Sequence, residues 1–181
     1  MTTPVFNTEK SLQAVLYVAN RLKRRDFHKI FKVLYFADRE HLAKYGRPIT
    51  GDTYVAMEYG PVPSMIYDIF KGVRGDGYQW PQIGEFKKLF QIKNRYNVEP
   101  LQDADQYYLS KTDVAELDAS LTKYGKLSWN EIVEKSHAFA WSKTSLNYRM
   151  AIEDIMQESG DYQEFITEIT ENIRAEKELN R

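Results

Sequence analysis

Apolar residues recur at helical spacing through the first 45 residues and predict two helices. The first helix follows Thr8, and its apolar positions are Leu12, Val15, Leu16, Ala19 and Leu22. Asp26 is a suitable N-cap for a second helix that reaches about Tyr45 and ends at Gly46. The stripe along this second helix comprises Phe27, Ile30, Phe31, Leu34, Asp38, His41 and Tyr45. Two polar side chains therefore share the face that the pattern predicts to be buried.

The stretch GDTYVAMEYGPVP, residues 51–63, interrupts the helical pattern and predicts a short strand with a stiff exit. Its centre, TYVAMEY, has the β-branched and aromatic content of a strand. Gly60 permits backbone conformations that other residues resist, and Pro61 and Pro63 fix φ. We therefore expect GPVPS to end the strand and Ser64 to cap a short helix, MIYDIFKG.

Residues 73–113 lack a clear helical pattern. The segment VRGDGYQWPQIGEF is rich in glycine and contains Pro81, so we expect an irregular surface segment. FQIKNRYNVEPL and QYYLS have extended character, and the DAD between them is turn-like. This arrangement predicts a hairpin whose two strands are these two stretches.

Helical patterns return with two capping boxes, S-K-T-D from Ser110 and S-W-N-E from Ser128. The helix behind the second box is expected to run to about residue 140 and to carry His137. A further short helix is expected to end at Met156.

Asp161 is a suitable cap for a last helix, and RAEKELNR at the end of the sequence is expected to fray because it has no apolar face. The inward positions of this helix are Tyr162, Phe165, Ile166, Ile169 and Ile173. The whole pattern predicts six or seven helices and two to four short strands, and strands do not alternate with full helices. Residues 1–181 are therefore predicted to form a single compact α+β domain, mainly α-helical, with a small antiparallel sheet or hairpins.

Composition and charge exclude several classes of function but say little about the fold. The formal net charge is −1, from 25 basic and 26 acidic residues, so no overall field attracts nucleic acid. The absence of cysteine excludes disulfides, thiolate metal sites and a cysteine nucleophile. The stretch MTTPVFNTEK lacks the pattern of a signal peptide, and no apolar run approaches the roughly 18 residues that span a bilayer. We expect a cytoplasmic protein with no membrane partner.

One local feature departs from this charge balance. Residues 21–29, RLKRRDFHK, hold five Lys or Arg side chains in nine positions. The favoured interpretation is a solvated helix end and connector, and a nucleic-acid interface is the alternative. Such an interface would give binding a steep salt dependence.

Asp38, His41 and His137 are the candidates for acid–base or metal chemistry. Asp38 and His41 are three positions apart on a predicted helix and project from one face. Together with His137 they could form a metal-ligand set or an oriented general base. Sequence does not show that His137 approaches the other two, and unpaired burial costs roughly 1–3 kcal/mol per group. Hydrogen bonds to the loop after Gly46 are the favoured interpretation, and no metal or cofactor is predicted.

The stretch around Gly60 also offers groups that could bind a partner. A stiff turn would present Tyr54, Met57, Tyr59 and Val62 with little conformational freedom to lose on association. Pre-organised aromatic and apolar side chains are good binding elements. The alternative is that these side chains fill the core beneath the neighbouring helices.

Three sub-motifs, LYFAD, YGRPITGD and MEYGPVP, follow one another within residues 32–69. Their order and spacing resemble the signature of the Panacea domain, also called the SocA-like antitoxin domain. Weaker similarity continues through YYLSKTD and YGKLSWNEIVEKSHAFAW, so the resemblance spans about residues 10–145 and leaves residues 146–181 as C-terminal helices. The positions that match the family's motifs are Leu34, Tyr35, Phe36, Asp38, His41, Tyr45, Gly46, Pro48, Ile49, Gly51, Tyr59, Gly60, Pro61, Val62 and His137.

The resemblance implies a bacterial or phage-borne antitoxin, with phage defence among its roles, and not an enzyme. Family members bind a protein toxin encoded by an adjacent gene and neutralise it directly. No catalytic role comes with the motif residues, and toxin-contacting positions do not transfer between members. If the motif is scaffold, toxin contacts lie elsewhere, with Tyr78, Trp80 and Phe86 as candidate anchors. The sequence leaves open whether the chain forms a homo-oligomer.

Overall fold

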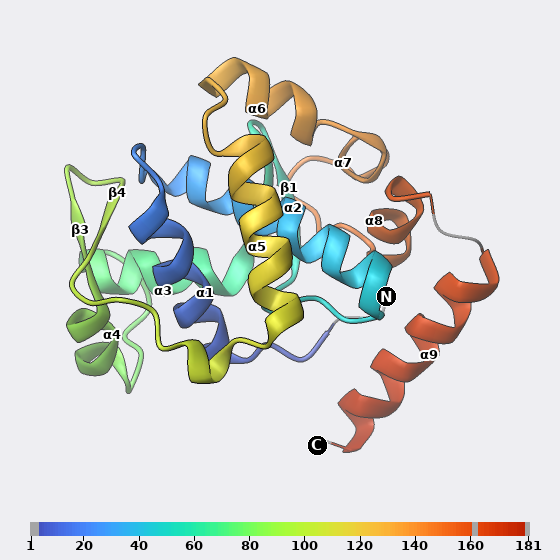
Figure 1. Cartoon of the computed structure of the whole chain (residues 1–181), viewed down its shortest axis with the longest axis horizontal. Coiled ribbons are helices and arrows are strands. Elements are labelled where there is room, and N and C mark those ends of the chain that lie inside the picture. The colour runs from blue at the N-terminus through green and yellow to red at the C-terminus, as the bar shows by residue number, and fades with distance from the viewer. Residues whose placement is uncertain (1–3, 161–162, 180–181) are drawn as a thin grey trace.

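A computed structural model describes residues 4–160 and 163–179 of the chain. Helix α2 (Phe27–Tyr45) passes through the middle of the molecule, with other elements packed on several sides of it (Figure 1). Thirteen of its 19 residues are buried, so more than its apolar stripe is covered. The Asp26 side chain caps the first turn by accepting a backbone N–H at 3.0 Å, and Gly46 ends the helix in the left-handed conformation.

Helices α1 (Thr8–Arg21) and α5 (Lys111–Tyr124) pack against α2 and against each other. Asn7, and not Thr8, caps α1, because its side chain accepts the N–H of Lys10 at 3.0 Å. The predicted capping box at Ser110 is present at the start of α5. The contact between α2 and α5 is the most extensive between any two described elements, and α5 crosses in front of α2 in Figure 1.

Residues 54–63 form a tight antiparallel hairpin. Strand β1 (Tyr54–Met57) pairs with β2 (Gly60–Pro63), and Val55 lies opposite Val62. The prediction that GPVPS ends the strand is wrong, because GPVP is itself the second strand. The other edge of β1 pairs with residues 147–150, so β1 lies between two neighbouring segments.

The two prolines of β2 fit this hairpin because their backbone nitrogens face outward. Ala56 donates its N–H to the carbonyl of Tyr148 at 2.9 Å, on the side of β1 away from β2. Pro61 lies opposite Ala56, so its nitrogen faces the outer edge, and Pro63 faces the same way. Proline at an outer edge leaves no ladder hydrogen bond unmade, and it discourages the pairing of a further strand.

The region predicted to be irregular contains an additional helix. Helix α3 (Ser64–Arg74) is followed by α4 (Ile83–Leu89), which its short length and the surrounding Gly and Pro residues hide in the sequence. α3 has no side-chain cap from its own first turn, so the prediction that Ser64 caps it is wrong.

The second hairpin lies entirely within FQIKNRYNVEPL. Strand β3 (Phe90–Lys93) pairs with β4 (Asn97–Pro100), and the turn between them uses positive φ at Asn94 and Arg95. The predicted pairing with QYYLS is wrong, because η1 (Gln106–Tyr108) is a short 3-10 helix.

Four helices complete the described part of the chain: α6 (Trp129–Ser136), α7 (Phe139–Lys143), α8 (Ile152–Glu158) and α9 (Gln163–Leu179). The capping box at Ser128 is present, and α6 ends before residue 140, with His137 as its C-cap. α9 lies at the edge of the molecule and continues to Leu179, so the predicted fraying from residue 174 is wrong (Figure 1). The predictions for Asp161 and Tyr162 fall outside the described residues.

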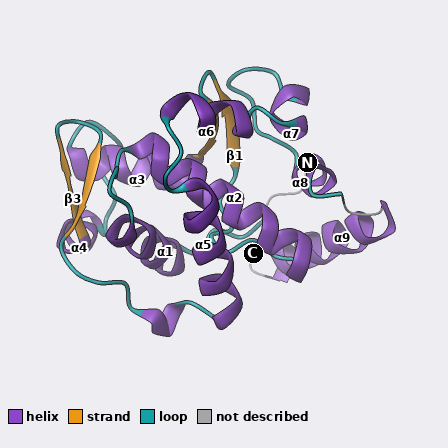
Figure 2. Cartoon of the chain, turned by 45° about the horizontal axis from the view of Figure 1, so that its top comes forward, coloured by secondary structure: helices purple, strands orange, loops and turns teal. Residues whose placement is uncertain are grey.

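α2 separates two clusters of buried apolar side chains and contributes to both. Ile30 and Phe31 join the cluster with α1 and α3, whereas Phe36 and Leu42 join the cluster with α8 and α9. The mainly helical α+β class is confirmed, and Figure 2 shows the strands at two separate places among the helices. The described residues form nine α-helices, more than predicted, because α4 and α7 are short. Among these residues, no helix combines the length and apolarity needed to cross a membrane.

Candidate functional site

The polar side chains buried along α2 bond to different parts of the chain. Lys29 donates to the carbonyls of Tyr124 and Leu127 at 3.1 and 2.5 Å, and Lys32 donates to the carbonyl of Pro61 at 2.9 Å. Burial lowers the pKa of Lys29 to about 8 and that of Lys32 to about 7. Because a buried polar group loses its hydration, these hydrogen bonds are needed, and they fix α2 to its neighbours.

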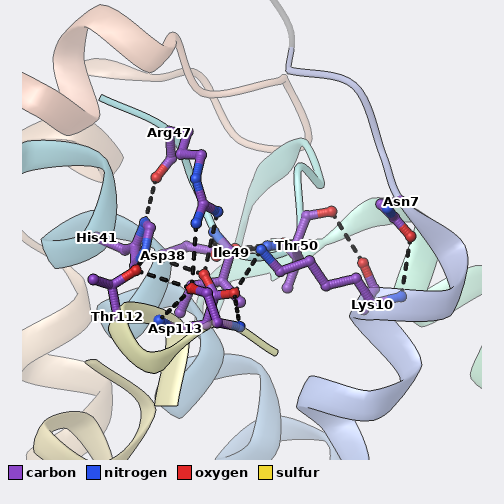
Figure 3. Close-up of polar contacts among 11 residues, drawn as sticks. Asn7, Lys10, Asp38, His41, Arg47, Ile49, Thr50, Thr112 and Asp113 are labelled. Carbon is purple, nitrogen blue, oxygen red and sulfur yellow. Dashed lines mark hydrogen bonds and ion pairs between the residues drawn. The ribbon is translucent and has the colours of Figure 1, made fainter. Parts of the chain in front are cut away.

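Asp38 organises the loop that follows α2. Its buried carboxylate accepts the N–H groups of Ile49 and Thr50 at 2.8 and 3.0 Å (Figure 3). It also accepts the hydroxyls of Thr50 and Tyr54 at 2.5 and 2.8 Å. Burial raises the pKa of Asp38, and these hydrogen bonds oppose the rise. A carboxylate has about four acceptor positions, so the loop and Tyr54 fill the capacity of Asp38.

Asp52 extends this network to the start of α3. Its N–H donates to the Thr50 hydroxyl at 3.1 Å, and its carboxylate accepts the N–H groups of Met65 and Ile66 at 3.0 and 2.9 Å. Burial raises the pKa of Asp52 to about 6 against the opposing effect of these hydrogen bonds. Asp52 therefore caps α3 from a distant loop, in the role predicted for Ser64.

His41 belongs to a second cluster of polar contacts. Its Nδ1 lies 2.7 Å from the carbonyl oxygen of Arg47, which only accepts, so Nδ1 carries a proton (Figure 3). Its Nε2 lies 3.0 Å from the Thr112 hydroxyl and 3.1 Å from Asp113 Oδ1. The ring is fully buried, so these contacts hold it between the loop and α5.

Asp113 is the centre of this second cluster. Besides His41, it pairs with Lys10 of α1 at 2.7 Å and with Arg47 of the loop at 3.2 Å. Burial by itself would raise the pKa of Asp113, but hydrogen bonds from His41, Lys10 and Ser110 hold it well below its usual range. One carboxylate thus joins α1, α2, the loop and α5.

His137 does not join Asp38 and His41. Its ring stacks on Trp141 at 3.6 Å, and burial and the charge of Lys32 lower its pKa. Lys32 precedes Asp38 and His41 by six and nine residues, or about 9 and 14 Å along a helix. Within the described part of the chain, no group of three His, Asp or Glu side chains is arranged to hold a metal ion. The metal or acid–base interpretation of the three residues therefore gains no support.

Tyr35, another motif residue, is also internal. Its hydroxyl lies 3.4 Å from both carboxylate oxygens of Glu158, and Arg39 pairs with Glu158 at 2.7 Å. Burial raises the pKa of Tyr35 well above its ordinary value. The buried Tyr54 ring packs against the Tyr35 ring at 5.0 Å. These two tyrosines, with Asp38 and His41, lie inside the fold and not on a contact surface.

Four other residues singled out from the sequence lie at an open groove with a volume of about 700 Å³. They are Met57, Tyr59, Gly60 and Val62, all in or beside the first hairpin. The other walls come from the first turns of α2, from Tyr67 of α3 and from the turn of the second hairpin. The groove is therefore built from segments far apart in the sequence.

Three side chains fix the tip of the hairpin by donating to alternate carbonyls. The donors are Trp141 Nε1 to Met57, His28 Nε2 to Tyr59 and Lys32 Nζ to Pro61, at 2.9, 3.1 and 2.9 Å. Burial, followed by the charge of Lys32, lowers the pKa of His28 to about 4, so its ring is neutral at neutral pH. The groove wall is thus held by side chains of two helices, α2 and α7.

Exposed aromatic side chains stand at the rim of the groove. Tyr59, Tyr96 and Trp129 are 50%, 50% and 40% exposed. Trp129 stacks on His28 at 3.6 Å and meets the edge of Tyr59 at 5.7 Å. His28, Tyr96 and Trp129 each belong to a different local motif, so no sequence spacing connects them as one site.

The candidate anchors in the following segment differ in exposure. Tyr78 is 66% exposed, Trp80 is half-buried, and Phe86 is 4% exposed in the core. Phe86 is therefore not available as a surface anchor, because α4 turns it inward. Tyr78 packs edge to face with Trp80, and Trp80 packs in the same way with Phe86, so the three rings form a chain from the surface to the core.

Comparison with known proteins identifies the family of the chain. Neither the curated proteins nor the solved structures include a significant match to the chain. A family model described as "Antitoxin SocA-like, Panacea domain" matches residues 30–142, which is more than half of the chain. The matched part contains the Asp38 network, the first hairpin and both capping boxes. The chain therefore belongs to the SocA-like antitoxin family with the Panacea domain.

Proposed function

We propose that the chain is the antitoxin of a bacterial or prophage toxin–antitoxin system, and that it neutralises its toxin in the cytoplasm by binding it directly. Membership of the SocA-like family supports the antitoxin role. The groove beside the first hairpin supports direct binding as the mechanism. The toxin is a protein encoded by an adjacent gene.

The observation that carries this proposal is the exposed aromatic rim of a groove whose hairpin wall is already fixed. Tyr59, Tyr96 and Trp129 supply large, partly apolar contact surfaces beside one groove. Aromatic residues of this kind dominate the binding energy of protein interfaces. The hydrogen bonds to the hairpin tip reduce the conformational entropy that association would otherwise remove.

Co-expression tests the proposal. The adjacent gene should stop growth when it is expressed alone, and this chain should restore growth. The purified proteins should co-elute from a size-exclusion column as one stoichiometric complex. A version of the antitoxin gene with an early stop codon is the control, because it shows whether the protein, and not its transcript, restores growth. A harmless neighbour, or toxicity that the protein does not relieve, would contradict the proposal.

A further inference from the structure

Basic residues flank one end of the groove, whose own lining includes Arg24 and the acids Asp26 and Glu58. The connector between α1 and α2 lies against β4, because Val98 donates its N–H to the carbonyl of Arg25 at 2.9 Å and Asp26 forms a bridge with Asn97. This contact places the basic run of residues 21–29 next to Arg95 in the second hairpin's turn. Two basic segments that are distant in the sequence therefore share one edge.

This edge carries several cationic side chains, and only some of them pair with an acid. Lys23 and Arg95 are exposed, and neither forms an ion pair with a carboxylate of the described residues. Asp26, the acid of the connector, is paired with Arg24 at 2.7 Å. The edge is therefore locally positive although the chain as a whole has a net charge of −1.

The floor of the groove is apolar beside this basic edge. Met57, Val62 and Tyr67 line it and are half-buried, and Phe27 and Phe31 lie beneath. A large apolar side chain placed on this floor would lose its hydration and would also remove the apolar surface of these residues from water. Apolar contact at the centre with charges at the rim is the usual construction of a protein interface.

We propose that this groove is where the toxin docks, and that its occupant is an acidic segment of the toxin. One large apolar side chain of that segment lies on the floor formed by Met57, Val62 and Tyr67. Its carboxylates face Lys23 and Arg95. The inference rests on the proposed antitoxin function and adds the chemistry of the partner.

Two features favour a folded or helical protein segment over other occupants. Nucleic acid binds by stacking on free ring faces, and these are fewer here because His28 covers one face of Trp129 and the Arg74 guanidinium lies 5.4 Å from the centre of the Tyr96 ring. Addition of an extended strand to β2 is disfavoured because Pro61 and Pro63 occupy its outer edge.

Charge reversal at the basic edge tests the inference. The variant Lys23→Glu/Arg95→Glu should weaken binding to the purified toxin by about tenfold or more, and the salt dependence of its Kd should become shallower. Lys87→Glu/Lys111→Glu is the matched control, since both lysines are exposed, lie outside the groove and give the same change in net charge. The control should bind as the wild type does. Circular dichroism and the melting temperature check that each variant is folded.

A second measurement examines the partner's chemistry. Peptides of about 15 residues that tile the toxin should include a binder with net negative charge and a large apolar residue. That peptide should compete with the whole toxin and bind Met57→Gln less tightly. The emission of Trp129 should shift on binding, and Trp129→Phe assigns the signal among the three tryptophans.

The outcomes separate the two proposals. If the toxin binds and is neutralised but the groove variants bind it as the wild type does, the docking inference is overturned and the antitoxin function stands. If no adjacent product is toxic, both are overturned. A single-stranded oligonucleotide of about 12 nucleotides that binds the wild type but not Lys23→Glu/Arg95→Glu, while toxin binding is unaffected, would assign the groove to nucleic acid instead.

Discussion

The ammonium group of Lys32 lies 2.9 Å from the carbonyl oxygen of Pro61, and no carboxylate of the described residues pairs with it. The side chain is fully buried beneath the hairpin whose tip borders the groove. A buried cation bonded to a neutral carbonyl is less favourable than the same cation in water. The position of the hairpin is therefore coupled to the protonation of this amine.

Replacement of Lys32 by Met should change how stability depends on pH. Burial lowers the pKa of Lys32 from 10.5 to about 7. Between these values the unfolded chain holds a proton that the folded chain lacks, so stability rises with pH across this interval and is flat on either side. In urea unfolding, the free energy of unfolding of the wild type should rise relative to that of Lys32→Met by up to about 1.4 kcal/mol per pH unit within this interval. The exposed variant Lys87→Met is the control, and a pH-independent difference would contradict the coupling.

Gly60 should be far less tolerant of substitution than Gly75. Both have nearly the same positive φ, +98° and +99°. A Cβ at Gly60 would overlap Ser136 Oγ and lie 2.7 Å from Lys32 Cε, whereas nothing lies within 4 Å at Gly75. Gly75→Ala should therefore cost only the backbone strain, about 1 kcal/mol, and Gly60→Ala about 3 kcal/mol, because overpacking adds to the strain.

The difference between these two variants is measured by chemical unfolding. Toxin binding gives a second readout, because displacement of Lys32 or Ser136 would move the hairpin that borders the groove. Equal costs at Gly60 and Gly75 would show that the close packing beneath the hairpin does not constrain it.

Asp38→Ala should destabilise the fold more than Asp38→Asn. Alanine leaves the N–H groups of Ile49 and Thr50 buried without acceptors, and each costs about 1–3 kcal/mol. Asparagine keeps one oxygen for these two donors, and its amide can donate to the hydroxyls of Thr50 and Tyr54. We expect losses of about 3 kcal/mol for Ala and about 1 kcal/mol for Asn. Tyr54→Phe, which removes a single donor, should match the smaller loss, and similar effects of Ala and Asn would rule out the network as drawn.

Local patterns predict those parts of the fold that local interactions determine. The stripe along α2 and the capping boxes at Ser110 and Ser128 are present because a helix and its cap are decided within a few residues. The strand GPVP was missed because proline usually ends a strand. It is compatible here because Pro61 and Pro63 face the outer edge of β2, a register that no local pattern reveals.

The same distinction applies to the site. The helical spacing of Asp38 and His41 led us to expect that both bond to the loop after Gly46, and both do. The groove combines Tyr59, Tyr96 and Trp129 from three distant segments, so the sequence gives no spacing that could connect them. No local pattern predicts the exposure of Tyr78 or the burial of Phe86, and the burial of Phe86 depends on how α4 packs.

Asp113→Asn should remove the charge that holds four segments together. The buried carboxylate pairs with Lys10, His41 and Arg47, and loss of one partner from a buried ion pair costs about 3 kcal/mol or more. Its pKa is lower in the folded state than the ordinary 3.8, so its contribution is complete above that value and is lost as pH falls towards the folded pKa. The stability gap between wild type and Asp113→Asn should therefore be constant near neutral pH and close below about pH 4. Asp103→Asn, at an exposed position, is the control for loss of a carboxylate. A gap that persists unchanged into acid would mean that Asp113 contributes through its shape and hydrogen bonds and not through its charge.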